Sequence, residues 1–140
     1  AKKIVLMTQK EVYLKLIDPK EVSPLSILLR YVSNISNQTN VGRNNFTPIP
    51  HVDSCYFSLI TNENIKNTSN NEVYKLMKTI FTHRRKNILN CLSRIINDKQ
   101  ECTKILESIN VDINSRPENL SINDYFKLLD VMKTNNIVIK

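Results

Sequence analysis

The stretch HVDSCYFSLI, residues 51–60, decides how the first half of the chain folds. Successive side chains of a β-strand point to opposite faces of the sheet. Alternate residues of the stretch form two sets, Val52, Ser54, Tyr56 and Ser58 in one and Asp53, Cys55, Phe57 and Leu59 in the other. This alternation predicts a strand that residues 57–60 complete.

Three segments before this strand have regular patterns of their own. The apolar run KIVLM, residues 3–7, predicts a buried strand, and a buried strand so early suggests a domain of which part is missing. Residues 9–18 have near-helical spacing and end before Pro19. Ser23 can cap a further helix that has Pro24 at its first position. The expected apolar positions are Val12, Leu16 and Ile17 in the first helix and Leu25, Leu28, Leu29, Val32 and Ile35 in the second.

The second half of the chain has a helical period. Residues 32–45 are polar and rich in Asn, which indicates a loop or an edge strand, and residues 61–71 contain almost nothing apolar, which marks a linker or surface loop and a domain boundary. After residue 71 the apolar spacing predicts an all-helical domain of about four helices. The expected buried positions are Val73, Leu76, Met77, Ile80, Phe81, Ile88, Leu92, Ile95, Ile96, Cys102, Ile105, Leu106, Ile109, Ile122, Tyr125, Phe126, Leu129 and Met132, and Ser121 with Asp124 forms a capping-box-like start.

The composition restricts the class of protein. Twenty Lys and Arg against 13 Asp and Glu give a net charge of +7 and a pI near 9.4. This balance favours an anionic partner such as nucleic acid or a membrane surface, and a soluble protein with extra lysines is an equal alternative. No apolar run approaches the roughly 18 residues of a membrane span, and no signal-peptide pattern opens the chain. We therefore expect an intracellular, soluble protein.

The content of cysteine, histidine and glycine excludes several kinds of site. Cys55, Cys91 and Cys102 are far apart and form no C-x-x-C pair, so we expect buried, reduced thiols. The two histidines are also distant in sequence, so we expect no zinc or other metal site. The single glycine, Gly42, cannot supply a glycine-rich loop for a nucleotide or S-adenosylmethionine.

Positive charge is concentrated between residues 72 and 104, which carry eight basic and three acidic groups. Its centre is HRRK, residues 83–86, at the junction of two predicted helices. Arginine forks bind phosphate oxygens, so the cluster suits a nucleic-acid backbone, and a solvated surface turn is the commoner alternative. The candidate residues are His83, Arg84, Arg85, Lys86, Lys75, Lys78 and Arg94.

Two prolines stiffen the chain just before the central strand. Pro48 and Pro50 restrict their own φ and bias the residue before each of them toward extended backbone. The segment is therefore expected to hold the neighbouring Phe46 in a defined place.

The adjacent residues His51, Asp53 and Ser54 are the types found in a nucleophile triad. On a strand, His51 and Asp53 would project to one face and Ser54 to the other. We therefore reject a catalytic relay among them.

Five segments in this order resemble a known family: IVLMTQKEV, PLS, FTPIPHVDS, FTHRRKNILNCL and NVDINSRPENLSINDYF. They are similar to the C-terminal part of the ribosomal RNA adenine dimethyltransferases, the KsgA-type enzymes, and look most like the bacterial or organellar branch. The likeness extends over nearly all 140 residues. Two motifs are specific: F-x-P-x-P-x-V-x-S is met at Phe46, Pro48, Pro50, Val52 and Ser54, and F-x-x-R-R-K-x-x-x-N-x-L at Phe81, Arg84, Arg85, Lys86, Asn90 and Leu92.

The resemblance implies an α/β part followed by an all-α part. Residues 1–60 would be the last strands and helices of a Rossmann-like S-adenosylmethionine methyltransferase sheet, 61–71 an Asn-rich linker, and 72–140 a small helical RNA-binding domain. In the family, the glycine-rich cofactor loop, the acidic ribose-binding residue and the catalytic N-x-P-aromatic tetrapeptide precede the part that is matched. We therefore expect a fragment that has no catalytic or cofactor-binding residue of its own.

The resemblance also implies a function for the full-length protein. Such enzymes transfer methyl groups from S-adenosylmethionine to N6 of two adjacent adenines near the 3′ end of small-subunit rRNA. By similarity Phe46 would stack on a flipped adenine, and residues 83–86 would bind rRNA backbone. Pro48, Pro50, Val52, Asp53 and Ser54 would form the surrounding structural motif. The expected partner is the immature small ribosomal subunit, and the expected protein is a monomer of the bacterial cytoplasm or of an organelle of bacterial descent, without membrane or metal.

Three alternatives stay open. The same scaffold could be a noncatalytic RNA-binding or ribosome-assembly factor, or an organellar transcription factor that resembles the same family. A generic basic helical domain is the third alternative, and it would require both long motif matches to arise by chance. An intact cofactor loop and catalytic tetrapeptide in the longer chain would separate the enzyme from the other classes.

Overall fold

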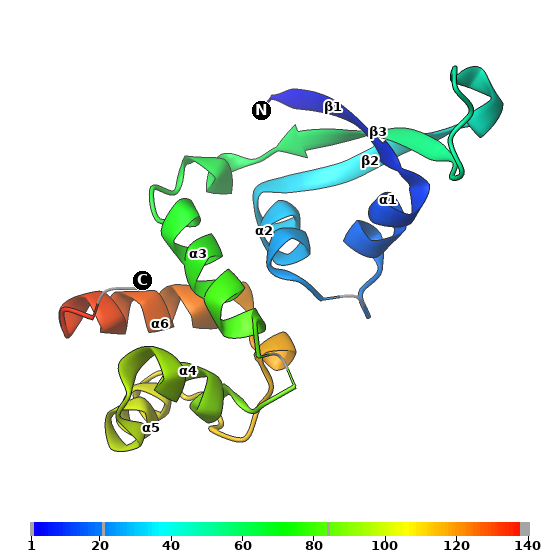
Figure 1. Cartoon of the computed structure of the whole chain (residues 1–140). Helices are drawn as coiled ribbons and strands as arrows, with labels where there is room; N and C mark the ends of the chain where they lie inside the picture. Colours follow the sequence, from blue (N-terminus) through cyan, green and yellow to red (C-terminus); the bar gives the residue numbers. More distant parts are fainter. Residues whose placement is uncertain (1, 21, 84, 138–140) are drawn as a thin grey trace. The chain divides into compact units, whose positions relative to one another are not determined.

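The computed structural model describes residues 2–20, 22–83 and 85–137. The chain divides into two compact units, Ala1–Asn67 and Thr68–Lys140 (Figure 1). The division falls inside the polar segment 61–71, but this segment is not wholly a linker. It contains the end of a strand at Thr61, a 3₁₀ turn at Glu63–Lys66 and the start of a helix at Asn70.

The first unit contains a three-stranded sheet with the order β1-β3-β2. Strands β1 (Lys3–Gln9) and β2 (Ser33–Val41) both pair antiparallel with the central strand β3 (Ser54–Thr61). The predicted alternation of β3 is confirmed for Cys55, Phe57 and Leu59, which are buried, and for Tyr56 and Ile60, which are exposed. Ser58 departs from it, because this residue belongs to the set of Tyr56 and is nevertheless buried.

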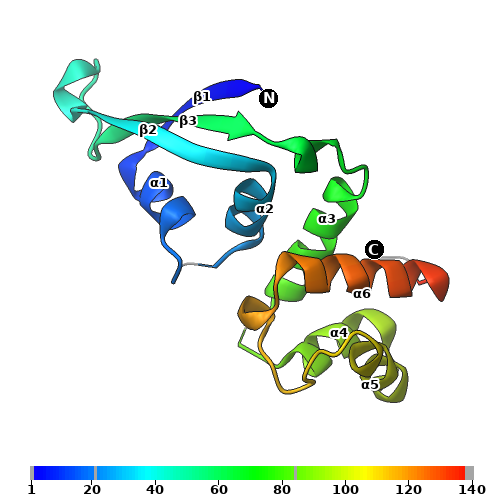
Figure 2. The same ribbon diagram turned by 180° about the vertical axis from the view of Figure 1, so that it is seen from behind.

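Two helices cover the buried face of this sheet, α1 (Lys10–Ile17) and α2 (Pro24–Val32) (Figures 1 and 2). Leu16 of α1 joins the buried cluster formed by β3, and Tyr13 and Leu29 pack against it. The rings of Tyr13 and Phe57 lie 5.0 Å apart between centroids. The small core therefore joins both helices to the central strand.

The predicted start of α2 is confirmed. The Ser23 hydroxyl accepts a hydrogen bond from the backbone N–H of Ser26 at 3.2 Å, and the Ser26 hydroxyl accepts one from the Ser23 N–H at 3.0 Å. The helix ends earlier than we expected, because Ser33 has extended backbone and Ile35 pairs with Leu59 in the sheet. Ile35 still packs against the same core, but from a strand rather than from the helix.

The prediction that the first strand is buried was wrong. β1 extends to Gln9 and lies at an edge of the described sheet, where Val5 and Met7 are each 59% exposed. Val12 and Ile17 of α1 and Leu25 of α2 are also exposed. An apolar run indicates only that its side chains favour burial, and the described residues do not bury them here.

The second unit contains four α-helices among its described residues, α3 (Asn70–Phe81), α4 (Ile88–Ile96), α5 (Lys99–Ser108) and α6 (Ile122–Thr134). A 3₁₀ turn, Pro117–Asn119, precedes α6. The expected capping box of Ser121 and Asp124 is present, and the predicted buried positions of α3 and α5 are all buried. Ile95, Ile96, Ile122 and Phe126 are only half-buried, whereas Leu128, which the periodic pattern did not include, is fully buried.

All three cysteines are free and buried, as the sequence predicts. Burial raises the pKa of Cys102 to about 11, because the apolar surroundings disfavour the thiolate. Burial likewise raises the pKa of the Cys91 thiol. These thiols therefore act as small apolar side chains of the helical core.

Tyr125 is the largest fully buried side chain of the helical unit, and its hydroxyl donates a hydrogen bond of 2.5 Å to the carbonyl of Pro117. We expect Tyr125→Phe to lower the free energy of unfolding by about 1–2 kcal/mol, because it leaves this buried carbonyl without its donor. Tyr74→Phe is the matched control, since Tyr74 is only half-buried. Denaturant unfolding of both variants tests this, and equal stability of Tyr125→Phe and the wild type would contradict it.

Candidate nucleic-acid interface

The loop between β2 and β3 forms a hollow in the first unit. A 3₁₀ turn, Arg43–Asn45, follows Gly42, and half-buried Phe46 follows the turn. The hollow has a volume of about 360 Å³ and is lined by Gln9, Phe46, Thr47, Pro48, Pro50, Val52 and Ser54. The peptide bond between Thr47 and Pro48 is cis. The structure thus brings Phe46 and four other residues of the expected motif together around one space.

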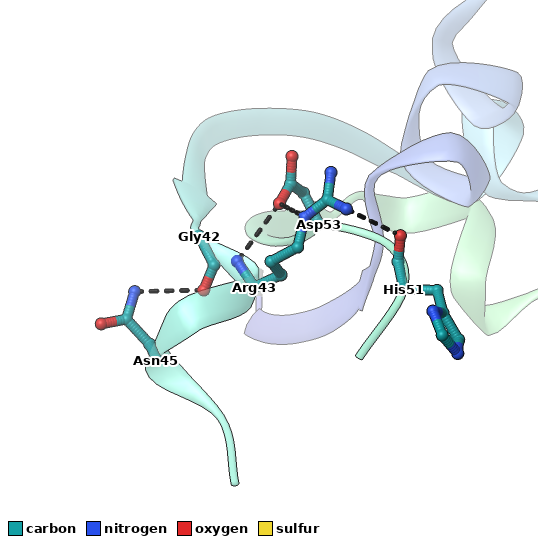
Figure 3. Close-up of polar contacts among 5 residues, drawn as sticks. All are labelled: Gly42, Arg43, Asn45, His51 and Asp53. Carbon is teal, nitrogen blue, oxygen red and sulfur yellow. Dashed lines mark hydrogen bonds and ion pairs between the residues drawn. The ribbon is translucent and has the colours of Figure 1, made fainter. Parts of the chain in front are cut away.

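Arg43 joins the two ends of this loop (Figure 3). Its backbone N–H and its Nε each donate to Oδ1 of Asp53 at 3.2 Å, and its Nη1 donates to the carbonyl of His51 at 3.0 Å. We call these three contacts the Arg43 clamp. The carbonyl of Asp53 also accepts a hydrogen bond of 2.9 Å from the backbone N–H of Lys10, which ties the clamp to the end of β1.

The clamp changes the electrostatics of Asp53. Hydrogen bonds from the backbone and then the side chain of Arg43 hold the pKa of the Asp53 carboxyl below its usual range, since they stabilise the carboxylate. Both side chains are partly exposed, about half of each. The pair therefore acts within the loop and adds little to the stability of the whole unit.

The structure places His51 and Asp53 differently from what we expected. β3 begins at Ser54, so His51 and Asp53 lie in the loop and not on a strand. The premise for rejecting a triad was therefore wrong. Asp53 is instead bound to Arg43, and the described contact of His51 with the clamp is through its backbone carbonyl.

Sequence reasoning missed Arg43 and Gln9. Arg43 stood in a polar segment without a regular pattern, ten residues before its partner Asp53. The only signal was the opposite charge of two residues that flank a proline-containing loop, and many surface pairs share that signal. Gln9 reaches the hollow because the sheet register pairs it with Ser54.

A second candidate surface lies in the helical unit between α3 and α4. Thr82, His83, Arg85 and Lys86 line a hollow of about 310 Å³, and Arg85 and Lys86 are exposed. Nη1 of Arg94 lies 3.0 Å from Nε2 of His83. A guanidinium can only donate, so Nε2 is the acceptor in this arrangement. We call His83, Arg85, Lys86 and Arg94 the basic junction, and Arg84 lies outside the described residues.

Contacts with the helical core fix the backbone of the basic junction. The thiol of Cys91 contacts the carbonyl of His83 at 3.2 Å. The backbone N–H of Ile88 donates to the carbonyl of Ser115 at 2.6 Å, and Asn87 caps α4 through its side chain. Arg85 and Lys86 thus extend from a turn whose backbone is fixed to the helical core, and Arg94 extends from α4.

The expected residues Lys75 and Lys78 lie on α3, on the side away from its buried residues. Nζ of Lys78 lies 5.5 Å from the centroid of the Tyr74 ring, and the carbonyl of Lys78 accepts a hydrogen bond from Thr82. Lys78 is thus about one helical turn from Thr82, which lines the same hollow, and Lys75 is nearly one turn further.

Two absences can be stated for the described part of the chain. No helix within residues 2–20, 22–83 and 85–137 is long and apolar enough to cross a membrane. In the same residues, no three His, Cys, Asp or Glu side chains lie together in a way that could hold a metal ion.

A family model described as Ribosomal RNA adenine dimethylase matches residues 1–134. The chain belongs to this family. It is 35% identical over 139 residues to the Ribosomal RNA small subunit methyltransferase A of Mycoplasma mycoides subsp. mycoides, a match that covers 96% of this chain and 52% of that protein. A protein of the same name from Ehrlichia canis is 35% identical over 127 residues, which covers 88% of this chain and 47% of the relative. The chain thus spans about half the length of these curated members of the adenine dimethylase family.

Solved structures show a related fold. A dimethyladenosine transferase from Plasmodium falciparum matches with a TM-score of 0.75 and 27% identity, over 99% of this chain and 60% of that protein. The 23S rRNA methyltransferase ErmE matches with a TM-score of 0.52 and 17% identity, over 94% of this chain and 55% of that protein, which is a likeness of fold alone. This adenine dimethylase family member therefore shares its fold with solved methyltransferase structures.

The Arg43 clamp makes a prediction about pH. We expect Asp53 to titrate below the usual range of an aspartic acid, and Arg43→Met to return its pKa toward that range. Because the folded-state pKa is the lower one, the stabilising contribution of the clamp is complete above the unfolded-state pKa and is lost as the pH falls through the folded-state pKa. Carboxyl ¹³C NMR titration measures this. Lys15→Met, which removes the exposed pair with Glu11, is the control and should leave Asp53 unchanged.

Proposed function

We propose that this chain is part of an enzyme that dimethylates adenine N6 in small-subunit rRNA, with S-adenosylmethionine as methyl donor. The observation that carries the proposal is the family match over residues 1–134, in a chain whose Phe46 lines a hollow with two prolines. The curated relatives are named as ribosomal RNA small subunit methyltransferases, and the solved Plasmodium falciparum structure is named as a dimethyladenosine transferase. These names supply the substrate class and the target base of the proposal.

We further propose that the chain is the C-terminal portion of such an enzyme. β1 and β2 run in the same direction with β3 antiparallel between them, an arrangement that suits one end of a mostly parallel sheet. The exposed apolar residues of β1, such as Val5 and Met7, suit a sheet whose second face would be covered by further elements of a longer domain. Together with the half-length match to the relatives, these features support a sheet continued by further strands of a Rossmann-like domain.

The single glycine of the chain, Gly42, does not lie in the setting that an S-adenosylmethionine site of the glycine-loop type requires. Gly42 has an ordinary φ of −62° and precedes a 3₁₀ turn in the loop between two strands. A cofactor loop of this type needs glycines between a strand and a helix, where backbone approaches the ligand. We therefore assign cofactor binding and methyl transfer to other residues of the longer enzyme, and substrate binding to this chain.

Phe46 is the residue that we propose to contact the target base. The exocyclic amine of adenine is a poor nucleophile because its lone pair is delocalised into the ring, so the enzyme must hold the base out of its stack in a defined orientation. One flat ring can hold another by stacking, which contributes about 1–3 kcal/mol per base. The apolar neighbours Pro48, Pro50 and Val52 would keep water from the edge of the stacked pair.

The basic junction is the surface that we propose to bind rRNA backbone. Its arginines and lysine are exposed, and forked guanidinium groups suit phosphate oxygens. Contacts to phosphate set the register of an RNA without reading its sequence. The partner is then the immature small ribosomal subunit, bound by a monomer in the bacterial cytoplasm or in an organelle of bacterial descent.

The basic junction yields a prediction about salt. In the full-length protein, the triple variant Arg84→Ala, Arg85→Ala and Lys86→Ala should bind small-subunit rRNA more weakly. The slope of log affinity against log salt should become shallower by about two to three, since roughly one counterion is released for each phosphate contact. The charge-matched control replaces Lys99, Lys104 and Lys127, which do not line the junction hollow. An unchanged slope in the triple variant would remove Arg84, Arg85 and Lys86 from the RNA interface.

The hollow yields a prediction about methyl transfer. Phe46→Leu keeps apolar bulk but loses the ring face, so methylation of immature small subunits by the full-length protein should fall about tenfold or more. Phe46→Tyr keeps the ring and should retain activity, and the stability of both variants should stay near that of the wild type. Ile49→Val, in the same loop but outside the hollow lining, is the control.

Two results would contradict parts of this proposal. Full activity of Phe46→Leu would exclude stacking by Phe46. A wild-type protein that binds rRNA but transfers no methyl group would exclude the enzyme and favour a noncatalytic RNA-binding or assembly factor.

A further inference from the structure

The Arg43 clamp lies directly beside the residue proposed to stack on the base. The backbone N–H of Phe46 donates to the carbonyl of Arg43 at 3.3 Å, so the position of Phe46 follows from that of Arg43. Asn45 is held in the same turn, because its Nδ2 donates to the carbonyl of Gly42 at 3.1 Å (Figure 3). Its backbone N–H donates to the same carbonyl, also at 3.1 Å. The turn that ends at Phe46 is therefore hydrogen-bonded internally and contains Arg43.

The clamp also joins separate segments of the hollow lining. Arg43 binds Asp53 and the carbonyl of His51, and these residues flank Val52, which lines the hollow. Asp53 in turn accepts a hydrogen bond from Lys10, the neighbour of the lining residue Gln9. One arginine thus connects the segment of Phe46 with the segments of Val52 and Gln9.

The chemistry of these contacts requires arginine. The guanidinium offers several N–H donors in a rigid planar fork, and two of them reach different acceptors here, Oδ1 of Asp53 through Nε and the carbonyl of His51 through Nη1. A lysine carries the same charge on a single nitrogen and would not keep this planar geometry. The side chains of Arg43 and Asp53 are 49% and 45% exposed, so the pair contributes little to global stability.

We infer that Arg43 is a positioning residue that keeps the Phe46 hollow in the shape that receives a flat base, and this inference rests on the proposed function. A loop that is ordered before binding loses less conformational freedom when the ligand arrives. Arg43 affects methyl transfer through the position of Phe46. The affinity for RNA, in contrast, depends mainly on the basic junction. Loss of the clamp therefore lowers the rate of methyl transfer more than it lowers the affinity for RNA.

The first arm of the test is independent of catalysis. In Arg43→Met of the full-length protein, amide hydrogen exchange of residues 42–53 should become about three- to tenfold faster, as expected when an exposed, hydrogen-bonded ion pair is removed. Arg43→Lys should fall between Arg43→Met and the wild type. The control is Lys15→Met, which removes an exposed ion pair of 3.5 Å on α1, and it should leave exchange in residues 42–53 unchanged. Equal exchange in Arg43→Met and the wild type would overturn the inference.

The second arm measures methyl transfer and RNA binding. Arg43→Met should lower kcat by about ten- to a hundredfold, the range expected when a reacting group is misplaced, with rRNA affinity and melting temperature near those of the wild type. An unchanged kcat in a variant with faster loop exchange would overturn the inference. A loss of RNA affinity as large as that of the basic-junction variant would also overturn it, because Arg43 would then bind phosphate directly. If the wild type transfers no methyl group, the proposed function fails, and the exchange measurement alone still decides whether Arg43 orders the loop.

Discussion

Burial of the inward face of β3 is the interaction on which the rest of the first unit depends. Cys55 and Phe57 are fully buried, and Leu59 is nearly so, beneath the two helices. A shift of the strand by one residue would turn these side chains to the opposite face, so their burial sets the register with both neighbouring strands. That register pairs Ser54 with Gln9 on one side and with Val41 on the other. The core therefore places the ends of all three described strands together, and the hollow forms at that end.

The candidate site depends on this core but is built from residues outside it. Phe46 and the two prolines lie in a loop that begins after Val41 and ends before Ser54, where only local contacts can hold it. The Arg43 clamp supplies such contacts between the two halves of the loop. The basic junction follows the same plan in the helical unit, since its cations are exposed while the buried Cys91 contacts the backbone beneath them. In both units the proposed substrate contacts are made by partly or fully exposed side chains on a backbone that other contacts hold.

Much of the fold could be predicted because local patterns carry it. The helical period identified the faces of α3 and α5, and Ser23 and Ser121 marked helix starts because a serine hydroxyl satisfies a free N–H there. The errors arose where one pattern of apolar residues is compatible with two different structures. Ile35 fitted the helical spacing but pairs with Leu59, and the apolar β1 suggested burial although the described sheet leaves it exposed.

The sequence by itself determined the strand alternation, the helices, the position of the basic junction and the presence of Phe46 beside two prolines. These features depend on residues that are near one another along the chain, so their patterns can be read in order. Only the tertiary structure decided that Gln9, Phe46 and Ser54 line one hollow and that Arg43 binds Asp53. The physical reason is that these contacts depend on sheet register and on distances of a few ångströms in space, and neither quantity has a signature in the order of the residues.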